Sequence, residues 1–277
     1  MNRYRIAGQE FLFPFAIPEF ESFRLEINEA GWSYTIPVPL GLICRAVGLV
    51  GGVERQVEVW SASSGILLKV MGGRDFYVEA GGKFILPGSG AATSELSELE
   101  REVVSGPALV LALALRGTWS LHASAVTLNG RTFAFLGESG QGKSTLAAYL
   151  AGNGWQLVAD DILPVRGGEV WPRFPQLKLP NDAQPGSLLP EHLRLDGVLV
   201  LASALPEEAP ALKLLPPGEA IQGVLRHTAG TRLLNPNLLA KHLMFCSHLA
   251  GQVPAYRLIY PARQDILPRV KEMLENL

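Results

Sequence analysis

The sequence predicts an α/β fold built from two modules, a β-rich N-terminal module and a C-terminal α/β module. In residues 1–86, short β-like runs are separated by Gly and Ser clusters, which is typical of strands joined by turns. From about residue 120 the order is strand, Gly-rich loop, helix, strand, as in a βαβ unit. A length of 277 residues, 48% of them apolar, is enough for two modest hydrophobic cores.

We place the module boundary between residues 92 and 93, giving modules at 1–92 and 93–277. A Pro-Gly-Ser-Gly stretch from Pro87 is typical of a linker. A connecting helix at about 95–115 should follow, with Thr93 or Ser94 as its cap. Toward the C-terminus we expect strands at 197–201 and 255–260 and helices at 218–227, 237–250 and 266–277.

Composition excludes several classes of protein. A formal net charge of −2 provides no basic field of the kind that nucleic-acid binders use, so we expect no nucleic-acid partner. The two cysteines, Cys44 and Cys246, are too far apart for a CxxC motif, which fits a reducing cytoplasm. No run approaches the roughly 20 apolar residues that span a membrane, and the N-terminus makes a poor signal peptide. We therefore expect a cytoplasmic protein with no membrane association.

A Gly-rich motif follows a predicted β-hairpin. Strand-like runs at 120–127 and 131–137 flank Asn129-Gly130, a pair that favours tight hairpin turns. The second run leads into Gly-Glu-Ser-Gly-Gln-Gly-Lys-Ser at 137–144, which satisfies the pattern GxxxxGK followed by Ser or Thr. The next expected elements are a helix and a strand, at 143–151 and 155–160.

This setting predicts a phosphate-binding loop rather than an ordinary Gly-rich turn. Glycines let consecutive N–H groups point at phosphate oxygens, and the helix N-terminus behind them adds about half a positive charge. Lys143 would bridge the β- and γ-phosphates of ATP, and the Ser144 hydroxyl would coordinate Mg²⁺. The predicted nucleotide-binding residues are Gly137, Glu138, Ser139, Gly140, Gln141, Gly142, Lys143, Ser144 and Thr145.

Two adjacent carboxylates, Asp160 and Asp161, come at the predicted end of the next strand. We expect this strand to lie beside the loop strand, where open α/β sheets bind ligands. Neighbouring side chains on a strand point in different directions, so one carboxylate can face a metal and the other an acceptor hydroxyl. The alternative is a solvated turn or a helix cap.

Other polar residues have two interpretations each. His122, on the strand before the loop strand, is either functional or a satisfied core histidine. Lys178 follows the aspartates closely enough to reach the phosphates, but a solvated lysine is equally consistent with the sequence. Arg226, His227 and Arg232 flank a predicted helix end, where cations offset the helix dipole without any chemistry.

The segment from Leu121-His122-Ala123 through the Gly-rich loop to Asp160-Asp161 resembles the kinase core of HPr kinase/phosphorylase, a bacterial serine kinase related in fold to phosphoenolpyruvate carboxykinase. The resemblance implies a P-loop kinase core. It implies Asp160 as the general base with His122 near it, and Asp161 and Ser144 on the metal side. Thr145 departs from the pattern, because bacterial HPr kinases carry an acidic residue there.

The layout of the whole chain more closely resembles the HPr kinase-like proteins encoded beside lasso-peptide and other ribosomal-peptide biosynthesis genes. This resemblance implies a kinase that phosphorylates a serine of a precursor peptide, with a peptide or protein substrate as partner. A homo-oligomer is possible, and we assign substrate capture to the N-terminal module. Two alternatives stay open: a nucleotide-sensing regulatory ATPase without an acceptor, and a small-molecule kinase acting on a sugar or alcohol.

Overall fold

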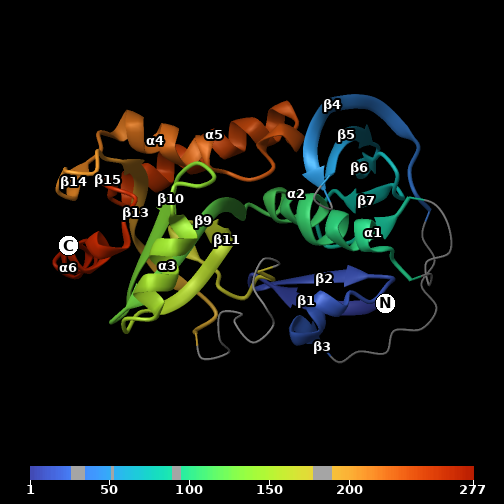
Figure 1. Cartoon of the computed structure of the whole chain (residues 1–277). Helices are drawn as coiled ribbons and strands as arrows, with labels where there is room; N and C mark the ends of the chain where they lie inside the picture. The colour runs from blue at the N-terminus through green and yellow to red at the C-terminus, as the bar shows by residue number, and fades with distance from the viewer. Residues whose placement is uncertain (26–34, 51–52, 89–94, 177–188) are drawn as a thin grey trace. The chain divides into compact units, whose positions relative to one another are not determined.

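The computed structural model describes residues 1–25, 35–50, 53–88, 95–176 and 189–277 as a mixed α/β fold (Figure 1). These residues form three β-sheets and two compact units. Unit 1 contains Met1–Trp119 and Gly230–Lys241, and unit 2 contains Ser120–Ala229 and His242–Leu277. The α/β class predicted from the sequence is confirmed.

Unit 1 holds two antiparallel sheets, ordered β2-β1-β3 and β4-β5-β6-β7-β8, so its predicted β-rich character is confirmed. An aromatic cluster fills the core beside the smaller sheet, where the ring centroids of Tyr4 and Phe13 lie 5.3 Å apart. The strands are β1 Asn2–Ile6, β2 Gln9–Phe13, β3 Arg24–Leu25, β4 Pro39–Val50, β5 Val53–Ala62, β6 Gly65–Val70, β7 Phe76–Glu79 and β8 Ile85–Pro87.

The connecting helix begins at Glu98 rather than near residue 95, and consists of α1 (Glu98–Val103), a π-helical turn (Val104–Ala108) and α2 (Leu109–Leu115). Its cap is Ser97, whose Oγ accepts from the Glu100 N–H at 3.3 Å while the Glu100 carboxylate accepts from the Ser97 N–H at 2.8 Å. This reciprocal capping box explains the later start, because it satisfies two orphan donors at once. The predicted caps, Thr93 and Ser94, lie outside the described residues.

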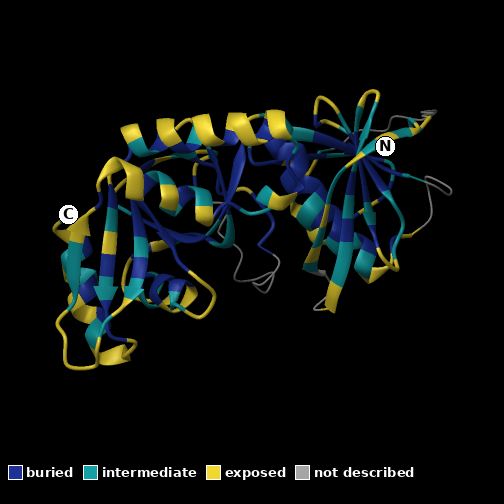
Figure 2. Cartoon of the chain, turned by 90° about the horizontal axis from the view of Figure 1, so that it is seen from above, coloured by how far each residue is buried: buried dark blue, intermediate teal, exposed yellow. Residues whose placement is uncertain are grey.

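The compact units divide the chain elsewhere than at the predicted boundary between residues 92 and 93, because the connecting helix is part of unit 1. Every residue from Leu109 to Ala114 is buried (Figure 2). At the end of α2, Arg116 donates to the Glu10 carbonyl at 2.8 Å and lies over the Phe11 ring. A helix that is apolar on all sides is a core element and not a linker.

Unit 2 is built on a seven-stranded sheet of order β10-β9-β11-β12-β13-β15-β14, in which β10 also pairs with β13. The predicted Asn129-Gly130 hairpin joins β9 and β10, with φ of 50° and 77° at the two turn residues. The strands are β9 Trp119–Leu128, β10 Arg131–Leu136, β11 Gln156–Arg166, β12 Glu169–Val170, β13 Leu193–Ser203, β14 Ala211–Leu214 and β15 Ala255–Tyr260.

Helices cover this sheet on both faces. Successive residues of β10 point to opposite sides: Phe133 and Phe135 pack in one core with residues of α3 and α6, whereas Ala134 and Leu136 belong to a second core with residues of α4 and α5. The helices are α3 Lys143–Ala151, α4 Pro217–Arg226, α5 Pro236–Gln252 and α6 Leu267–Glu275, close to the predicted positions. In the described part of the chain, no helix is long and apolar enough to cross a membrane.

The strand that carries the aspartate pair differs from the prediction in two respects. Asp160 and Asp161 lie in the middle of β11 rather than at its end, because the strand continues through the buried Leu163 and Val165. In addition, β11 does not neighbour the loop strand. Both edges of β10 are occupied, one by β9 and the other by β13, so β9 lies between β10 and β11.

We expect the Ser97→Ala variant to lose about 1 kcal/mol of unfolding free energy, since it leaves a donor of the first turn of α1 without its cap. The measurement is urea unfolding followed by circular dichroism. Ser97→Asp is the matched control, because a carboxylate can accept the same hydrogen bond and should restore most of the loss. Equal stability of the alanine variant and the wild type would contradict this assignment of the cap.

Candidate functional site

The Gly-rich loop runs from the end of β10 to the start of α3. Gly140 and Gly142 have φ of 84° and 83°, in the left-handed region that glycine adopts without strain. The loop is closed by its own side chains and backbone: the Glu138 N–H donates to Gln141 Oε1 at 2.7 Å, and the Gln141 N–H donates to the Glu138 carbonyl at 3.2 Å. Contacts between Glu138 and Gln141, and positive φ at two glycines, therefore hold the loop backbone in a tight turn.

Lys143 stands at the first position of α3 with its side chain folded back over the loop. It is only 7% exposed, and its ammonium donates to the carbonyls of Gly137 at 2.7 Å and Glu138 at 3.1 Å. Ser144 and Thr145 follow on the same turn and are exposed. A buried ammonium, a helix N-terminus and two exposed hydroxyls thus gather at one place, which favours the binding of an anion.

The register of the hairpin brings His122 to this loop. Leu136, the last residue of β10, lies opposite Ala123, and Phe135 lies opposite Ser124. The chain enters the loop immediately after Leu136, so His122 and Ser124 flank the point of entry. Because they are two residues apart on a strand, their side chains lie on the same face of β9.

The two aspartates lie on β11, which runs along the edge of β9 opposite to β10, and each has its own partner on β9. Ser124 Oγ donates to Asp160 Oδ1 at 2.5 Å, and His122 Nδ1 lies 3.1 Å from Asp161 Oδ1. The side chains of His122 and Asp161 are 37% and 20% exposed. The structure therefore brings together the predicted residues His122, Asp160 and Asp161, through β9.

The backbone of the aspartate pair is held in an unusual way. Asp161 has φ of 114°, a conformation that side chains with a Cβ rarely adopt and that costs of order 1–3 kcal/mol. The Asp160 N–H donates to Gln176 Oε1 at 2.8 Å, and the Gln176 amide donates to the Ile162 carbonyl at 2.9 Å. Gln176 is 1% exposed, so a buried amide fixes the strand on both sides of Asp161.

A second group of residues reaches the loop from the end of α4. The chain after this helix is tied to β9 because the His122 N–H donates to the His227 carbonyl and the Ala229 N–H donates to the Ser120 carbonyl, each at 2.7 Å. Arg226 Nε lies 2.9 Å from Glu138 Oε1. Burial lowers the pKa of His227; Glu138 acts in the opposite direction, and the positive charges of Lys143 and Arg226 lower it further.

The remaining predicted residues have different outcomes. Arg232 belongs to unit 1, where its carbonyl accepts from Cys44 Sγ at 2.8 Å. Lys178 lies outside the described residues. Ser124 and Gln176 were missed by the sequence analysis. The spacing of Ser124 from His122 was an available signal, whereas nothing local marks Gln176.

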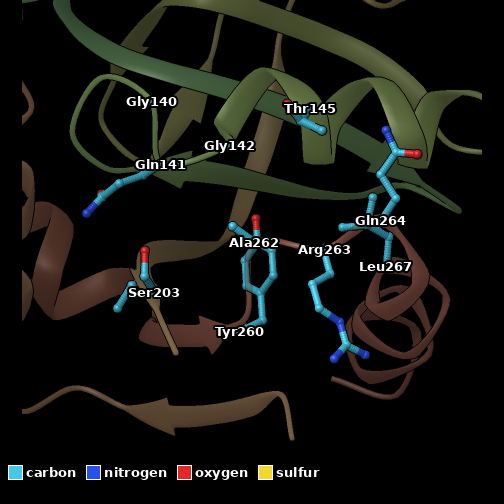
Figure 3. Close-up of a pocket in the computed structure, with 11 residues that line it drawn as sticks. Gly140, Gln141, Gly142, Thr145, Ser203, Tyr260, Ala262, Arg263, Gln264 and Leu267 are labelled. Carbon is cyan, nitrogen blue, oxygen red and sulfur yellow. The ribbon is translucent and has the colours of Figure 1, made fainter. Parts of the chain in front are cut away.

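A cavity of about 300 Å³ opens on another side of the loop, against the ends of β13 and β15 (Figure 3). In Figure 3 the Tyr260 hydroxyl points toward Gly142, and burial raises the pKa of Tyr260. The sequence analysis also missed this cavity, since its lining comes from distant parts of the chain. It is lined by Gly140, Gln141, Gly142, Thr145, Ala202, Ser203, Tyr260, Ala262, Arg263, Gln264 and Leu267.

Among the described residues, no group of three or more His, Cys, Asp or Glu side chains is placed so that it could hold a metal ion. The predicted ligands, the Ser144 hydroxyl and the Asp161 carboxylate, are both oxygen donors. Mg²⁺ prefers oxygen donors and commonly uses only one or two protein ligands beside waters and substrate phosphates. The residue types therefore fit Mg²⁺ carried by a nucleotide rather than a preformed metal centre.

The chain matches no protein-family model and no curated protein. Among solved structures, the HPr(Ser) kinase/phosphatase from Coxiella burnetii is similar with a TM-score of 0.31 and 13% sequence identity, covering 57% of this chain and 88% of that chain. A similarity of this size transfers neither fold nor function, so the functional interpretation depends on the residues of this chain.

The backbone at Asp161 leads to a comparison of two variants. Asp161→Gly and Asp161→Ala both remove the carboxylate, but only glycine tolerates the φ of 114°. We expect the glycine variant to be more stable than the alanine variant by about 1 kcal/mol, which urea unfolding of the two proteins would measure. An alanine variant at least as stable as the glycine variant would show that this backbone is not held in the left-handed region.

Proposed function

We propose that this protein is a Mg-ATP-dependent phosphotransferase. The observation that carries the proposal is the register of β9 and β10, which sets His122 and, through β9, the two aspartates beside a Gly-rich loop with a buried lysine. A nucleotide-binding loop alone would fit many proteins. A carboxylate beside the loop adds a group that can accept a proton from an attacking hydroxyl.

The loop supports a definite orientation for the nucleotide. The phosphates would lie against the N–H groups of residues 138–144 and the start of α3. In the present structure Lys143 donates to two loop carbonyls, and it would exchange them for β- and γ-phosphate oxygens. The nucleoside would occupy the neighbouring cavity, whose wall includes Tyr260 and Thr145 (Figure 3).

Phosphoryl transfer would then follow from these positions. The acceptor hydroxyl oxygen forms a bond to the γ-phosphorus as the bond from that phosphorus to the β–γ bridging oxygen breaks, leaving ADP. Asp160 takes the proton of the hydroxyl through the carboxylate that Ser124 orients at 2.5 Å. Mg²⁺, held by Ser144 and Asp161, would supply neutralisation of phosphate charge. His122 holds Asp161 by its Nδ1 contact.

For the acceptor we propose a serine hydroxyl of a ribosomal precursor peptide of the lasso type. This choice rests on the layout of the whole chain, with a β-rich N-terminal module and a helix before Leu121-His122-Ala123, which resembles HPr kinase-like proteins encoded beside peptide biosynthesis genes. A regulatory ATPase and a small-molecule kinase share the same nucleotide site and differ only in the acceptor. The product of the reaction therefore distinguishes these two alternatives from a peptide kinase.

The first experiment incubates the protein with Mg-ATP and the precursor peptide encoded nearest its gene, and weighs the peptide by intact mass analysis. We expect a gain of one phosphate that is lost in Asp160→Asn while ATP still binds. The asparagine keeps an Oδ1 acceptor for Ser124, so the strand should stay in place. Transfer of phosphate to a metabolite would instead support the small-molecule kinase. Hydrolysis of ATP without a phosphorylated product would support the regulatory ATPase.

Lys143→Ala tests the nucleotide site separately from the acceptor. Removing a charge-assisted contact to phosphate should weaken Mg-ATP binding by roughly 10- to 100-fold, as isothermal calorimetry would measure. Lys213→Ala is the control, because Lys213 is an exposed lysine on β14. If the Lys143 variant bound Mg-ATP as tightly as the wild type, the loop would not be the phosphate-binding site.

A further inference from the structure

The two aspartates contact the same face of β9, although they are neighbours on β11. Ser124, the partner of Asp160, and His122, the partner of Asp161, are two residues apart and therefore share a face of β9. This face is the one toward α3, because Ser124 lies opposite Phe135, which packs with residues of α3. Adjacent side chains of a regular strand point to opposite faces. One of the two aspartates must therefore depart from the regular pattern.

Asp161 is the residue that departs. Ala159, Leu163 and Val165 lie two or four positions away from it on β11, and all three belong to the core formed with residues of α4 and α5. A regular strand would therefore point the Asp161 side chain into this apolar core, where an isolated carboxylate is strongly unfavourable. The φ of 114° at Asp161 breaks the alternation, and the carboxylate contacts His122 instead. The unusual backbone thus places two carboxylates on one face of the sheet.

The side chain of Gln176 bonds to the backbone on both sides of this irregular position. Its Oε1 accepts from the Asp160 N–H at 2.8 Å, and its Nε2 donates to the Ile162 carbonyl at 2.9 Å. The amide is itself fixed, because Nε2 also donates to the Phe174 carbonyl at 3.2 Å. Gln176 is buried, so water cannot readily replace these hydrogen bonds if the side chain is removed.

We infer that Gln176 is a positioning residue, whose amide keeps Asp161 in the conformation that brings its carboxylate to the face of the loop. This inference rests on the proposed function, in which Asp161 holds Mg²⁺. Positive φ is unfavourable for a residue with a Cβ, so without the amide the backbone at Asp161 relaxes toward a regular strand. The carboxylate then leaves the metal side of the site. The phosphate-binding loop has no contact with Gln176 among the hydrogen bonds described above and keeps its shape.

The experiment measures the binding of ADP by isothermal calorimetry, once with EDTA and once with Mg²⁺. Gln176→Met fills a similar volume without either hydrogen bond. It should bind metal-free ADP as tightly as the wild type does, because Lys143 and the loop are unchanged. The gain in affinity that Mg²⁺ gives the wild type should fall by about tenfold or more, and half-maximal ADP formation from ATP should require roughly 10- to 100-fold more Mg²⁺.

Three further variants separate positioning from a general loss of structure. Asp161→Gly removes the metal ligand and tolerates the positive φ, so adding Gln176→Met to it should reduce the Mg²⁺ gain no further. Gln156→Met changes an exposed glutamine at the start of β11 and should match the wild type. Gln176→Asn keeps the amide but is one methylene shorter, so it cannot reach both backbone groups. It should show the same loss of the Mg²⁺ gain, and it serves if Gln176→Met does not fold.

The outcomes distinguish this inference from the proposed function. An undiminished Mg²⁺ gain in the Gln176 variants would overturn the inference, and so would independent losses that multiply in the double variant with Asp161→Gly. Failure of the wild type to bind ADP, or to form ADP from Mg-ATP, would instead refute the proposed function itself.

Discussion

The antiparallel pairing of β9 with β10 is the constraint on which the site depends. Its register is set by the Asn129-Gly130 turn, and it places Ala123 opposite the last residue of β10. A shift of one residue would turn His122 and Ser124 to the other face of the sheet and remove both aspartate contacts. Because one face of this hairpin packs with α3 and the other with α4 and α5, burial on both sides resists such a shift.

The polar groups of the loop bind one another or neighbouring side chains, and this determines how a ligand would bind. Lys143, the N–H of Glu138 and the side chain of Arg226 already have partners within or beside the loop. The buried Lys143 ammonium donates to two carbonyls, which offsets part of the cost of taking its charge out of water. A phosphate ligand would therefore exchange contacts rather than fill vacant ones. Affinity then depends on the difference between two sets of hydrogen bonds.

The features of the site that depend on consecutive residues could be predicted from the sequence. The hairpin, the loop and the helix behind it follow from consecutive residues, and the proximity of His122 to the aspartates followed from a family resemblance. The features that depend on contacts between distant segments could not be predicted. The position of β9 between β10 and β11 is decided by competition for the edges of β10. Gln176, the cavity beside Tyr260 and the contact of Arg226 with Glu138 depend on tertiary packing, which no spacing in the chain reveals.

The membership of Gly230–Lys241 in unit 1 has a consequence for how the chain folds as it is made. A ribosome delivers residues in order at roughly 5–20 per second, and N-terminal domains commonly fold before the rest has emerged. Unit 1 cannot finish folding in this way, because Cys44 contacts Arg232, which is synthesised much later. This contact closes a long loop of chain between the two residues. Strand β4 therefore meets the segment 230–241 only after most of unit 2 has been synthesised. Until then, the side of β4 that contacts Arg232 in the folded protein is uncovered, and an uncovered edge strand can pair with other chains.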